Sequence, residues 1–497
     1  MSEYNFYYDE SEHSRKINHK TITADNYYDN FIAVVVGWRS EYETDLFSKY
    51  TAFEEKYKDR QSKELKSSTI RQSQLEHGFA SLNNTNISLL EDFLALFDEK
   101  TLIYYAVISK IEYIIRQLFE DYKNSLLVDM DAMKYSITKA VVLYKPADII
   151  NGFYDNTGDL VTLLKKFFTS EIEKDKANEA LKKMEIEQYN QILMLLDDVS
   201  TIKTINWNYD ISFDGFKKYL TEKSIENYSL TIDEEGENSN TAKAAERECL
   251  TTVLEADSLT SCGIRMADML AGLISKLLKA LHKALSYTTE GEQVRKKLLN
   301  INWFVVSDQQ LSLYKRLNYV LVDLNKSWYK AYSGIYSDDV IVLIAFLNFM
   351  SHFETVEVIT SDIAMQSEYF NVCACESLSD YYNRMYNKLP IDPVVRNSSD
   401  YFLNRRGAKV YFDINKQPML KITKDRIVCD ALAVGFSKER MPLITIAEAG
   451  NVKCYRLPIE LSEWALTVVG YANKGVNLFP AKVVFSKAKD GLCADIL

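Results

Sequence analysis

More than a hundred residues, from Glu112 to about Leu220, show an almost unbroken helical pattern that is rich in Lys and Glu. This stretch separates segments in which strand and helix patterns alternate, and it is too long to be a single βα crossover. The chain of 497 residues also contains only 7 Pro and 16 Gly, which favours long helices and excludes linker-dominated or collagen-like folds. We therefore expect an α/β fold with a large helical insertion.

Strand patterns flank this helical stretch. The β-branched run 31–38 (FIAVVVGW) is typical of a buried strand, and residues 4–9, 102–108 and 228–233 have related patterns. The clearest helix spans 263–285, where apolar residues form one stripe. Residues 300–385 are again largely helical, and residues 389–400 hold two Pro and are typical of a linker.

The last hundred residues differ from the rest in pattern and in charge. The hydrophobic period becomes two, which predicts a β-rich module with strands near 409–415, 419–428, 443–447, 453–459, 466–472 and 481–486. Residues 401–497 contain 15 Lys and Arg and 9 Asp and Glu, a net charge of +6, whereas the whole chain carries −11. A basic module attached to an acidic body predicts a surface that faces a polyanion or a protein partner.

Composition also limits the location of the protein. The seven cysteines are sparse and odd in number, unlike a secreted disulfide framework. The acidic N-terminus lacks the apolar segment of a signal peptide. The longest apolar stretch, 340–350, is too short to span the ~30 Å hydrocarbon core of a membrane. We therefore expect a soluble, cytoplasmic protein without membrane association.

Carboxylates are the main candidate functional groups in the sequence. The motifs of P-loops, dinucleotide-binding folds, serine hydrolases and zinc peptidases are absent. Asp9 and Asp233 end two predicted strands, Asp257 precedes the long helix, and Asp268 lies in its second turn. Gly272 and Ser275, further along the same helix, would let it lie close to the sheet and bring Asp268 against the strand ends.

Such carboxylates allow two interpretations. Convergent carboxylates are the ligands that Mg²⁺ and Mn²⁺ prefer, and paired ions ~3.5–4 Å apart can clamp the oxygens of a phosphoryl displacement. Alternatively, Asp9 lies in a solvated turn, Asp257 caps the helix, and Asp268 interacts with the helix dipole. The pattern alone does not decide between them.

Two segments resemble a known family. YYDESEH at the N-terminus and DSLTSCGIRMADMLAGLI near residue 270 are similar to the two ends of the uncharacterised domain-of-unknown-function family 3800. That family has a DE pair near its start, a QxxD motif near its end and an RNase H-like fold. The resemblance matches Asp9 and Glu10 to the DE pair and Asp268 to QxxD, with Asp233 and Asp257 at intervening acidic positions.

One position departs from the motif. Arg265 replaces the Gln of QxxD, one helical turn before Asp268. A permanent cation there can pair with Asp268 and block a metal, hold a substrate phosphate, or point to solvent. We assign Arg265 to substrate binding.

The resemblance and the residue pattern together predict an α/β fold with an RNase H-like mixed sheet. We expect it to comprise 1–110 and 223–290, a helical insertion at 111–222, a helical region and linker at 291–400, and the basic module at 401–497. The implied function is metal-dependent hydrolysis of RNA or DNA in bacterial defence or mobile-element biology. Asp9, Asp233, Asp257 and Asp268 would bind Mg²⁺ or Mn²⁺, with Glu10 as an additional catalytic residue. The alternative is a catalytically silent RNase H-like scaffold that binds a protein or a nucleic acid.

Overall fold

A computed structural model of the chain describes most of its residues: 3–12, 17–24, 26–60, 64–124, 129–155, 157–199, 202–203, 205, 210–234, 240–287, 296–386, 401–403, 409–411, 417–422, 426–437, 441–448, 451–473, 476, 478–488 and 491–497. The chain divides into two compact units. The first comprises 1–121 and 133–378, and the second comprises 122–132 and 379–497. The linker predicted at 389–400 lies outside the described residues.

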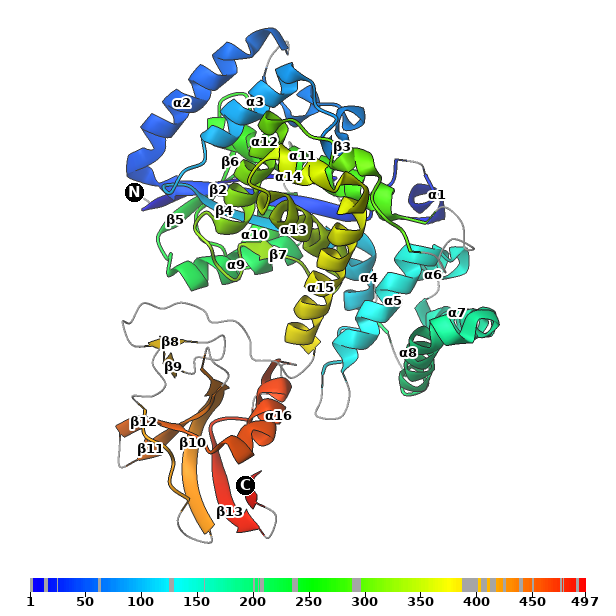
Figure 1. The fold of residues 1–497 in the computed structure, drawn as a ribbon, viewed down its shortest axis with the longest axis vertical. Coiled ribbons are helices and arrows are strands. Elements are labelled where there is room, and N and C mark those ends of the chain that lie inside the picture. The colour runs from blue at the N-terminus through cyan, green and yellow to red at the C-terminus, as the bar shows by residue number, and fades with distance from the viewer. Residues whose placement is uncertain are drawn as a thin grey trace. The chain divides into compact units, whose positions relative to one another are not determined.

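A six-stranded mixed sheet forms the centre of the first unit (Figure 1). Its strands are β1 (Tyr4–Ser11), β2 (Asn30–Arg39), β4 (Leu102–Ser109), β5 (Tyr228–Asp233), β6 (Val253–Ala256) and β7 (Ala331–Tyr332). The spatial order is β6-β5-β1-β2-β4-β7; β1, β2 and β4 pair antiparallel, while β5 runs parallel to both β1 and β6. Apart from the short edge strand β7, this is the order 5-4-1-2-3 of the RNase H-like pattern. The predicted α/β sheet is thereby confirmed.

The helices of the first unit include the long helical stretch between β4 and β5. Within that stretch lie α4 (Lys110–Leu118), α5 (Met130–Tyr144), α6 (Ala147–Asp155), α7 (Thr157–Asp175), α8 (Glu179–Asp197) and α9 (Ile211–Lys223), of which α5 begins in the second unit. The others are α1 (His19–Ile22), α2 (Glu43–Lys56), α3 (Asn84–Ala95), α10 (Asn240–Arg247), α11 (Cys262–Leu285), α12 (Asp308–Asn318), α13 (Asp338–Ser351), α14 (Val356–Ser361) and α15 (Gln366–Tyr386), which continues into the second unit. A short strand, β3 (Glu76–Phe79), lies outside the sheet.

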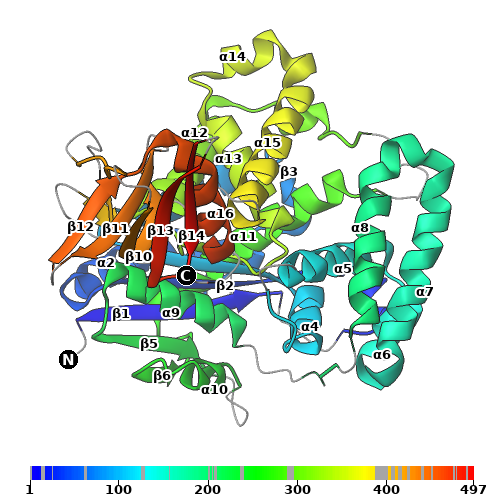
Figure 2. The same cartoon turned by 90° about the horizontal axis from the view of Figure 1, so that it is seen from below.

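Opposite faces of the sheet are covered by different helices. Phe6 and Tyr8 of β1 pack with Phe213 and Phe216 of α9 in one buried core, to which α10 also contributes. The other face carries α11, with α12 beyond it (Figures 1 and 2), and α3 packs against α12. Because side chains alternate along a strand, the odd-numbered residues of β1 point toward α11.

Gly263 sets the close approach of α11 to the sheet. A Cβ atom at this position would lie 2.1 Å from Cγ of Tyr7 on β1, far inside van der Waals contact. The prediction that Gly272 would serve this purpose is wrong, because Gly272 lies against Ser67 of a neighbouring segment instead. The helix therefore meets the sheet at its first turn, five residues before Asp268.

The second unit contains a five-stranded antiparallel sheet in the order β12-β11-β10-β13-β14. Its elements are β10 (Arg426–Phe436), β11 (Pro442–Glu448), β12 (Asn451–Arg456), α16 (Ser462–Asn473), β13 (Ala481–Ala488) and β14 (Gly491–Ile496), with the separate pair β8 (Tyr401–Leu403) and β9 (Lys409–Tyr411). The predicted β-rich module is thus confirmed.

Within the stretch that forms the five-stranded sheet, one predicted strand is wrong and one strand was missed. Residues 466–472 belong to α16, although Thr467, Val468 and Val469 have high strand propensity. Leu461, Ala465 and Val468 recur at helical spacing and are buried against the sheet, so tertiary packing overrides propensity. The missed strand, β14, has a simple alternation of exposed and half-exposed residues.

Across the described ranges, no helix combines the length and the apolar character needed to cross a lipid bilayer.

We expect Gly263→Ala to destabilise the first unit by about 1–3 kcal/mol, because the added methyl group overpacks the contact with Tyr7. Urea unfolding followed by circular dichroism measures the effect. Gly152→Ala in α6 is the matched control, since its Cβ would meet only the flexible ends of Leu163 and Leu160, at 3.0 and 3.6 Å. Equal stability of the Gly263 variant and the wild type would contradict the proposed helix contact.

Candidate functional site

Asp9 and Asp233 lie side by side at the carboxyl ends of two parallel strands. The last registered pair between β1 and β5 is Tyr8 with Ile232, and each aspartate follows immediately. The Oγ of Ser229 donates to Oδ1 of Asn5 at 3.0 Å, so the alternate residues of both strands share one face of the sheet. That face is the one covered by α11, which carries Asp268.

The three aspartates form one electrostatic group. Burial raises the pKa of Asp9 well above its ordinary value, and the charges of Asp268, Glu10 and Asp233 raise it further. The backbone N–H of Glu10 donates to Oδ1 of Asp9 at 2.7 Å and opposes this shift. Burial also raises the pKa of Asp233, although hydrogen bonds from the N–H groups of Ser258 and Glu234 lower it in part. Asp9 therefore holds its charge at an energetic disadvantage.

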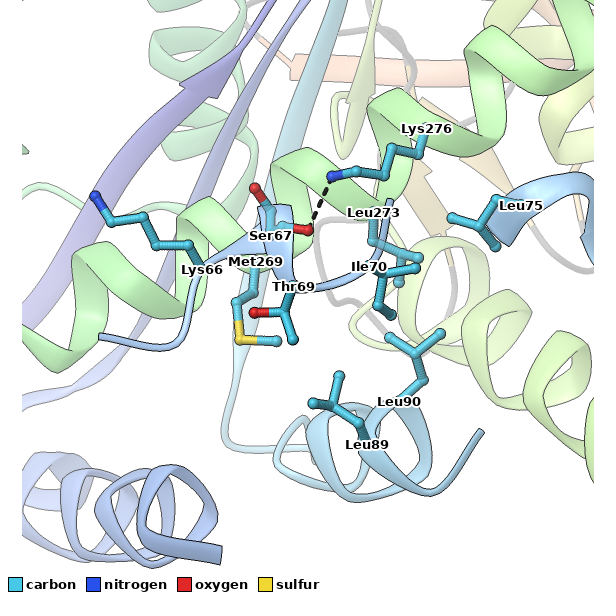
Figure 3. A pocket seen from close by; sticks show the side chains of 10 residues that line it. All are labelled: Lys66, Ser67, Thr69, Ile70, Leu75, Leu89, Leu90, Met269, Leu273 and Lys276. Carbon is cyan, nitrogen blue, oxygen red and sulfur yellow. Dashed lines mark hydrogen bonds between the residues drawn. The ribbon is translucent and has the colours of Figure 1, made fainter. Parts of the chain in front are cut away.

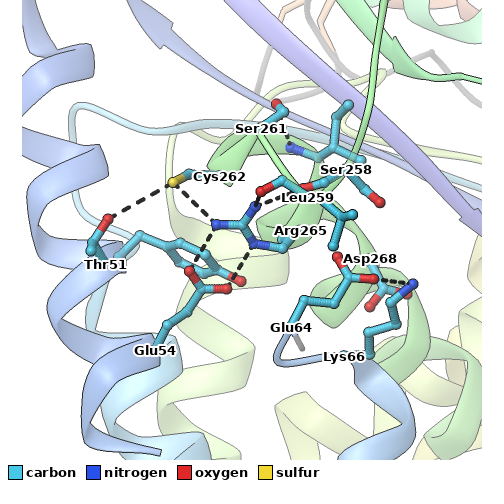
Figure 4. Close-up of polar contacts among 12 residues, drawn as sticks. Thr51, Glu54, Glu64, Lys66, Ser258, Leu259, Ser261, Cys262, Arg265 and Asp268 are labelled. Carbon is cyan, nitrogen blue, oxygen red and sulfur yellow. Dashed lines mark hydrogen bonds and ion pairs between the residues drawn. The ribbon is translucent and has the colours of Figure 1, made fainter. Parts of the chain in front are cut away.

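Glu64 and Lys66 extend this group from the segment that follows α2. Lys66 Nζ forms an ion pair with Oε1 of Glu64, and this bond raises the pKa of Lys66, with smaller contributions from the charges of Asp268 and Asp233 (Figure 4). The side chain of Glu64 is only 11% exposed, and its Oε2 is buried without a hydrogen-bond partner. The sequence gives no signal for this pair, since the local KELK pattern is typical of any solvated surface.

Asp268 also fixes the neighbouring segment η3 (Ser67–Thr69) on α11. Its carboxylate accepts hydrogen bonds from the backbone N–H of Ser67 at 2.9 Å and from Ser67 Oγ at 3.1 Å. Lys276 Nζ donates to the carbonyl of Ser67 at 2.9 Å, and Gly272 leaves room for the Ser67 side chain. Asp268, Gly272 and Lys276 are spaced by four residues, so they lie along one face of the helix.

An apolar pocket lies beside this segment (Figure 3). The aliphatic parts of its wall come from α3, α11 and the segment around η3, and Lys66, Ser67 and Lys276 also line it. The hydroxyl of Thr69, another lining residue, is buried without a hydrogen-bond partner. The pocket therefore joins a largely aliphatic interior to the lysines near Asp268.

Arg265 does not pair with Asp268. Its Nε and Nη2 donate to the two carboxylate oxygens of Glu54 on α2, at 2.7 and 2.8 Å (Figure 4). Its Nη1 donates to the carbonyls of Ser258 and Leu259 at 2.6 and 3.0 Å, and Nη2 also contacts Cys262 Sγ at 3.4 Å. With its donors engaged and its side chain 10% exposed, Arg265 ties α2, the loop before α11 and α11 together. Among the three roles considered from the sequence, neither an Asp268 partner nor a solvent-facing residue matches this geometry, and the donors are not directed at a ligand.

The remaining predicted residues lie apart from the aspartate group. Glu10 points to the opposite face of β1, where its Oε2 accepts a hydrogen bond of 2.5 Å from Tyr8. Asp257 is exposed, and its Oδ1 accepts a hydrogen bond of 2.9 Å from the N–H of Leu259 within the same turn. The structure thus brings together Asp9, Asp233 and Asp268 and adds Glu64. The alternative expectation that Asp257 caps the long helix is wrong, because Ser261 is the N-cap of α11.

The donor chemistry of this group fits a hard divalent cation. All four side chains offer carboxylate oxygens, Glu64 retains a buried oxygen without a partner, and Asp9 carries a charge that its neighbours disfavour. In the part of the chain that the structure describes, no three Asp, Glu, His or Cys side chains are already gathered into a metal-binding set. The fit therefore rests on ligand type and charge.

Comparison with known proteins adds no assignment: no protein-family model, no curated protein and no solved structure matches this chain. The resemblance to family 3800 remains a prediction from the sequence.

Asp9→Asn should stabilise the protein at pH 7.5. The pKa of Asp9 is higher in the folded protein than in the unfolded chain (~3.9), so protonated Asp9 stabilises the fold at a pH below ~3.9. This stabilisation is lost as the pH rises through the folded-state pKa of Asp9. The neutral amide avoids this loss, so the variant should melt at a higher temperature than the wild type at pH 7.5 and at about the same temperature near pH 3. Asp257→Asn is the control, and an Asp9→Asn protein that melts lower at pH 7.5 would contradict the expectation.

Arg265→Gln should destabilise the first unit by about 1–3 kcal/mol, because it leaves the partly buried carboxylate of Glu54 without its cation. Urea unfolding of the single variant and of Arg265→Gln combined with Glu54→Gln measures this, and the double variant should recover part of the loss. The matched control is Arg247→Gln, which breaks a more exposed pair with Asp210 and should change stability by less than about 1 kcal/mol. A stable Arg265→Gln single variant would show that the pair has no structural role.

Proposed function

We propose that this protein is a metal-dependent nuclease that hydrolyses phosphodiester bonds of RNA or DNA at the aspartate group of its RNase H-like sheet. One observation carries the proposal. Asp9 is partly buried near Asp268 and Asp233, and burial together with these charges raises its pKa. Two carboxylates at the ends of parallel strands, with a third on the helix that covers them, are typical of sites that bind cations.

The chain's own residues would each have a separate task. Asp9, Asp233 and Asp268 would hold Mg²⁺ or Mn²⁺, which when bound activates water and stabilises the charge that develops on the phosphoryl oxygens. The strand pairing of β1 with β5 fixes the spacing of Asp9 and Asp233, and α11 positions Asp268 above them. Arg265, through Glu54 and the carbonyls of the loop before α11, holds the start of this helix in place.

Nucleic acid is the proposed substrate for two reasons. The resemblance to family 3800 implies phosphodiester chemistry, and residues 401–497 carry a net charge of +6 that suits a polyanion. A defence or mobile-element setting, and a protein partner for the second unit, follow from the same sequence argument. Both belong to the proposal.

A catalytically silent scaffold is the second candidate. Both carboxylate oxygens of Asp268 accept hydrogen bonds from Ser67, so Asp268 already has a structural role in the absence of any ion. On this interpretation the aspartates are retained to fix segment positions, and the sheet supports binding of a protein or a nucleic acid.

Titration calorimetry with Mn²⁺ and cleavage of a mixed panel of RNA and DNA separate the two candidates. For the nuclease, Asp9→Asn and Asp268→Asn should each abolish Mn²⁺ binding and divalent-dependent cleavage with little loss of folded structure. Asp257→Asn should change both by less than about twofold, because that side chain is exposed and bonded within its own turn. Wild-type protein that neither binds Mn²⁺ nor cleaves the panel would support the scaffold.

A further inference from the structure

The charge of Lys66 lies within an otherwise acidic neighbourhood. Its ammonium group pairs with Glu64, and the charges of Asp268 and Asp233 act on it as well. The next residue in the chain, Ser67, donates both its N–H and its hydroxyl to Asp268. Lys66 is therefore held beside Asp268 by the chain itself, and it supplies a positive charge to carboxylates that come from three different elements.

Glu64 and Lys66 differ in how firmly they are held. The Glu64 side chain is 11% exposed, whereas that of Lys66 is 50% exposed. A lysine has a flexible stem and a compact charge, so its head group can move into water at little loss, while a buried carboxylate cannot leave in the same way. Departure of Lys66 would leave Glu64 as a buried anion that needs another cation.

Glu64 also has an acceptor that nothing satisfies. Its Oε2 is buried and has no hydrogen-bond partner, although buried polar atoms are bonded in the large majority of cases. Figure 4 shows the Glu64 carboxylate on the side of its segment that faces Asp268, next to the Lys66 head group. The unpartnered oxygen and the half-exposed ammonium of Lys66 thus lie together beside Asp268.

We propose that Lys66 is the resident counter-ion of this site, and that a divalent cation displaces it and gains Glu64 as a further carboxylate ligand. The inference rests on the proposed function, because it assumes that the aspartate group binds such an ion. It adds two residues, neither of which the sequence pattern or the family resemblance indicates. It also explains how the carboxylates stay together in the absence of metal.

The consequence is competition between two cations for the same carboxylates. Removing the Lys66 ammonium should strengthen binding of the divalent cation, and removing the Glu64 charge should weaken it. One unit charge within a few ångströms in a partly solvated site changes ion affinity by about tenfold. Lys66→Arg keeps the competing charge and should behave much as the wild type does.

Calorimetric titration of the full chain with Mn²⁺ tests the proposal without any substrate. Lys66→Met should bind Mn²⁺ about tenfold more tightly than the wild type, and Glu64→Gln about tenfold more weakly. The matched control is Lys58→Met, which removes an exposed lysine that pairs with Glu55 in the same stretch of chain. This control should bind Mn²⁺ with wild-type affinity.

Thermal unfolding with and without Mn²⁺ provides a second readout. Without metal, Lys66→Met should melt below the wild type because the carboxylates lose their counter-ion, and added Mn²⁺ should raise its melting temperature by more than it raises that of the wild type. Lys66→Gln replaces Lys66→Met if the latter fails to fold.

The outcomes separate this inference from the proposed function. Wild-type protein that binds Mn²⁺ through Asp9 and Asp268, while the Lys66 and Glu64 variants bind it equally well, overturns the counter-ion proposal and leaves the nuclease proposal intact. Wild-type protein without Mn²⁺ affinity overturns both. Tighter binding by Lys66→Met together with weaker binding by Glu64→Gln supports the displacement.

Discussion

The contact between Gly263 and the ring of Tyr7 is the constraint on which the site depends. Only a residue without a side chain lets the first turn of α11 meet β1 at this distance, since a Cβ would lie 2.1 Å from the ring. From that point the helix period places Asp268 near the strand ends, Gly272 against Ser67, and Lys276 within reach of the Ser67 carbonyl. Arg265 then fixes the same turn to α2 through Glu54, so the helix can neither slide nor rotate without breaking a partly buried, bidentate ion pair.

The contacts of α11 stabilise the fold, whereas the group of Asp9, Asp233, Asp268 and Glu64 lowers its stability. Burial and like charge both raise the pKa of Asp9, so ionising it at neutral pH works against folding. The surrounding structure offsets this with backbone N–H groups, with Ser67 on Asp268, and with the nearby ammonium of Lys66. Like charges that the surrounding structure holds close together are common in functional sites, and they have no evident value in a purely structural core.

Local patterns predicted much of the fold and part of the site. The apolar run 31–38 and the apolar stripe of α11 are long and regular, so the strand and the helix could be predicted from the sequence. Asp9 and Asp233 could therefore be placed at strand ends, and Asp268 on a helix that faces them. The partner of Arg265 could not be predicted, because Glu54 lies 211 residues away and such pairs leave no local pattern. Glu64 and Lys66 were missed for the same reason, and α16 because β-branched residues outweighed its helical period.

The order of the strands along the chain has a consequence for synthesis. The central strand β1 ends at Ser11, yet its neighbour β5 starts only at Tyr228, after the whole helical stretch between β4 and β5. At typical translation rates of about 5–20 residues per second, the open edge of β1 waits on the order of 10–40 s for its partner. During that interval, β1, β2 and β4 can form an antiparallel half-sheet in which β1 is an edge strand. Its free edge is of the kind that invites pairing with other chains. The nascent protein is therefore most vulnerable to aggregation before its acidic site exists.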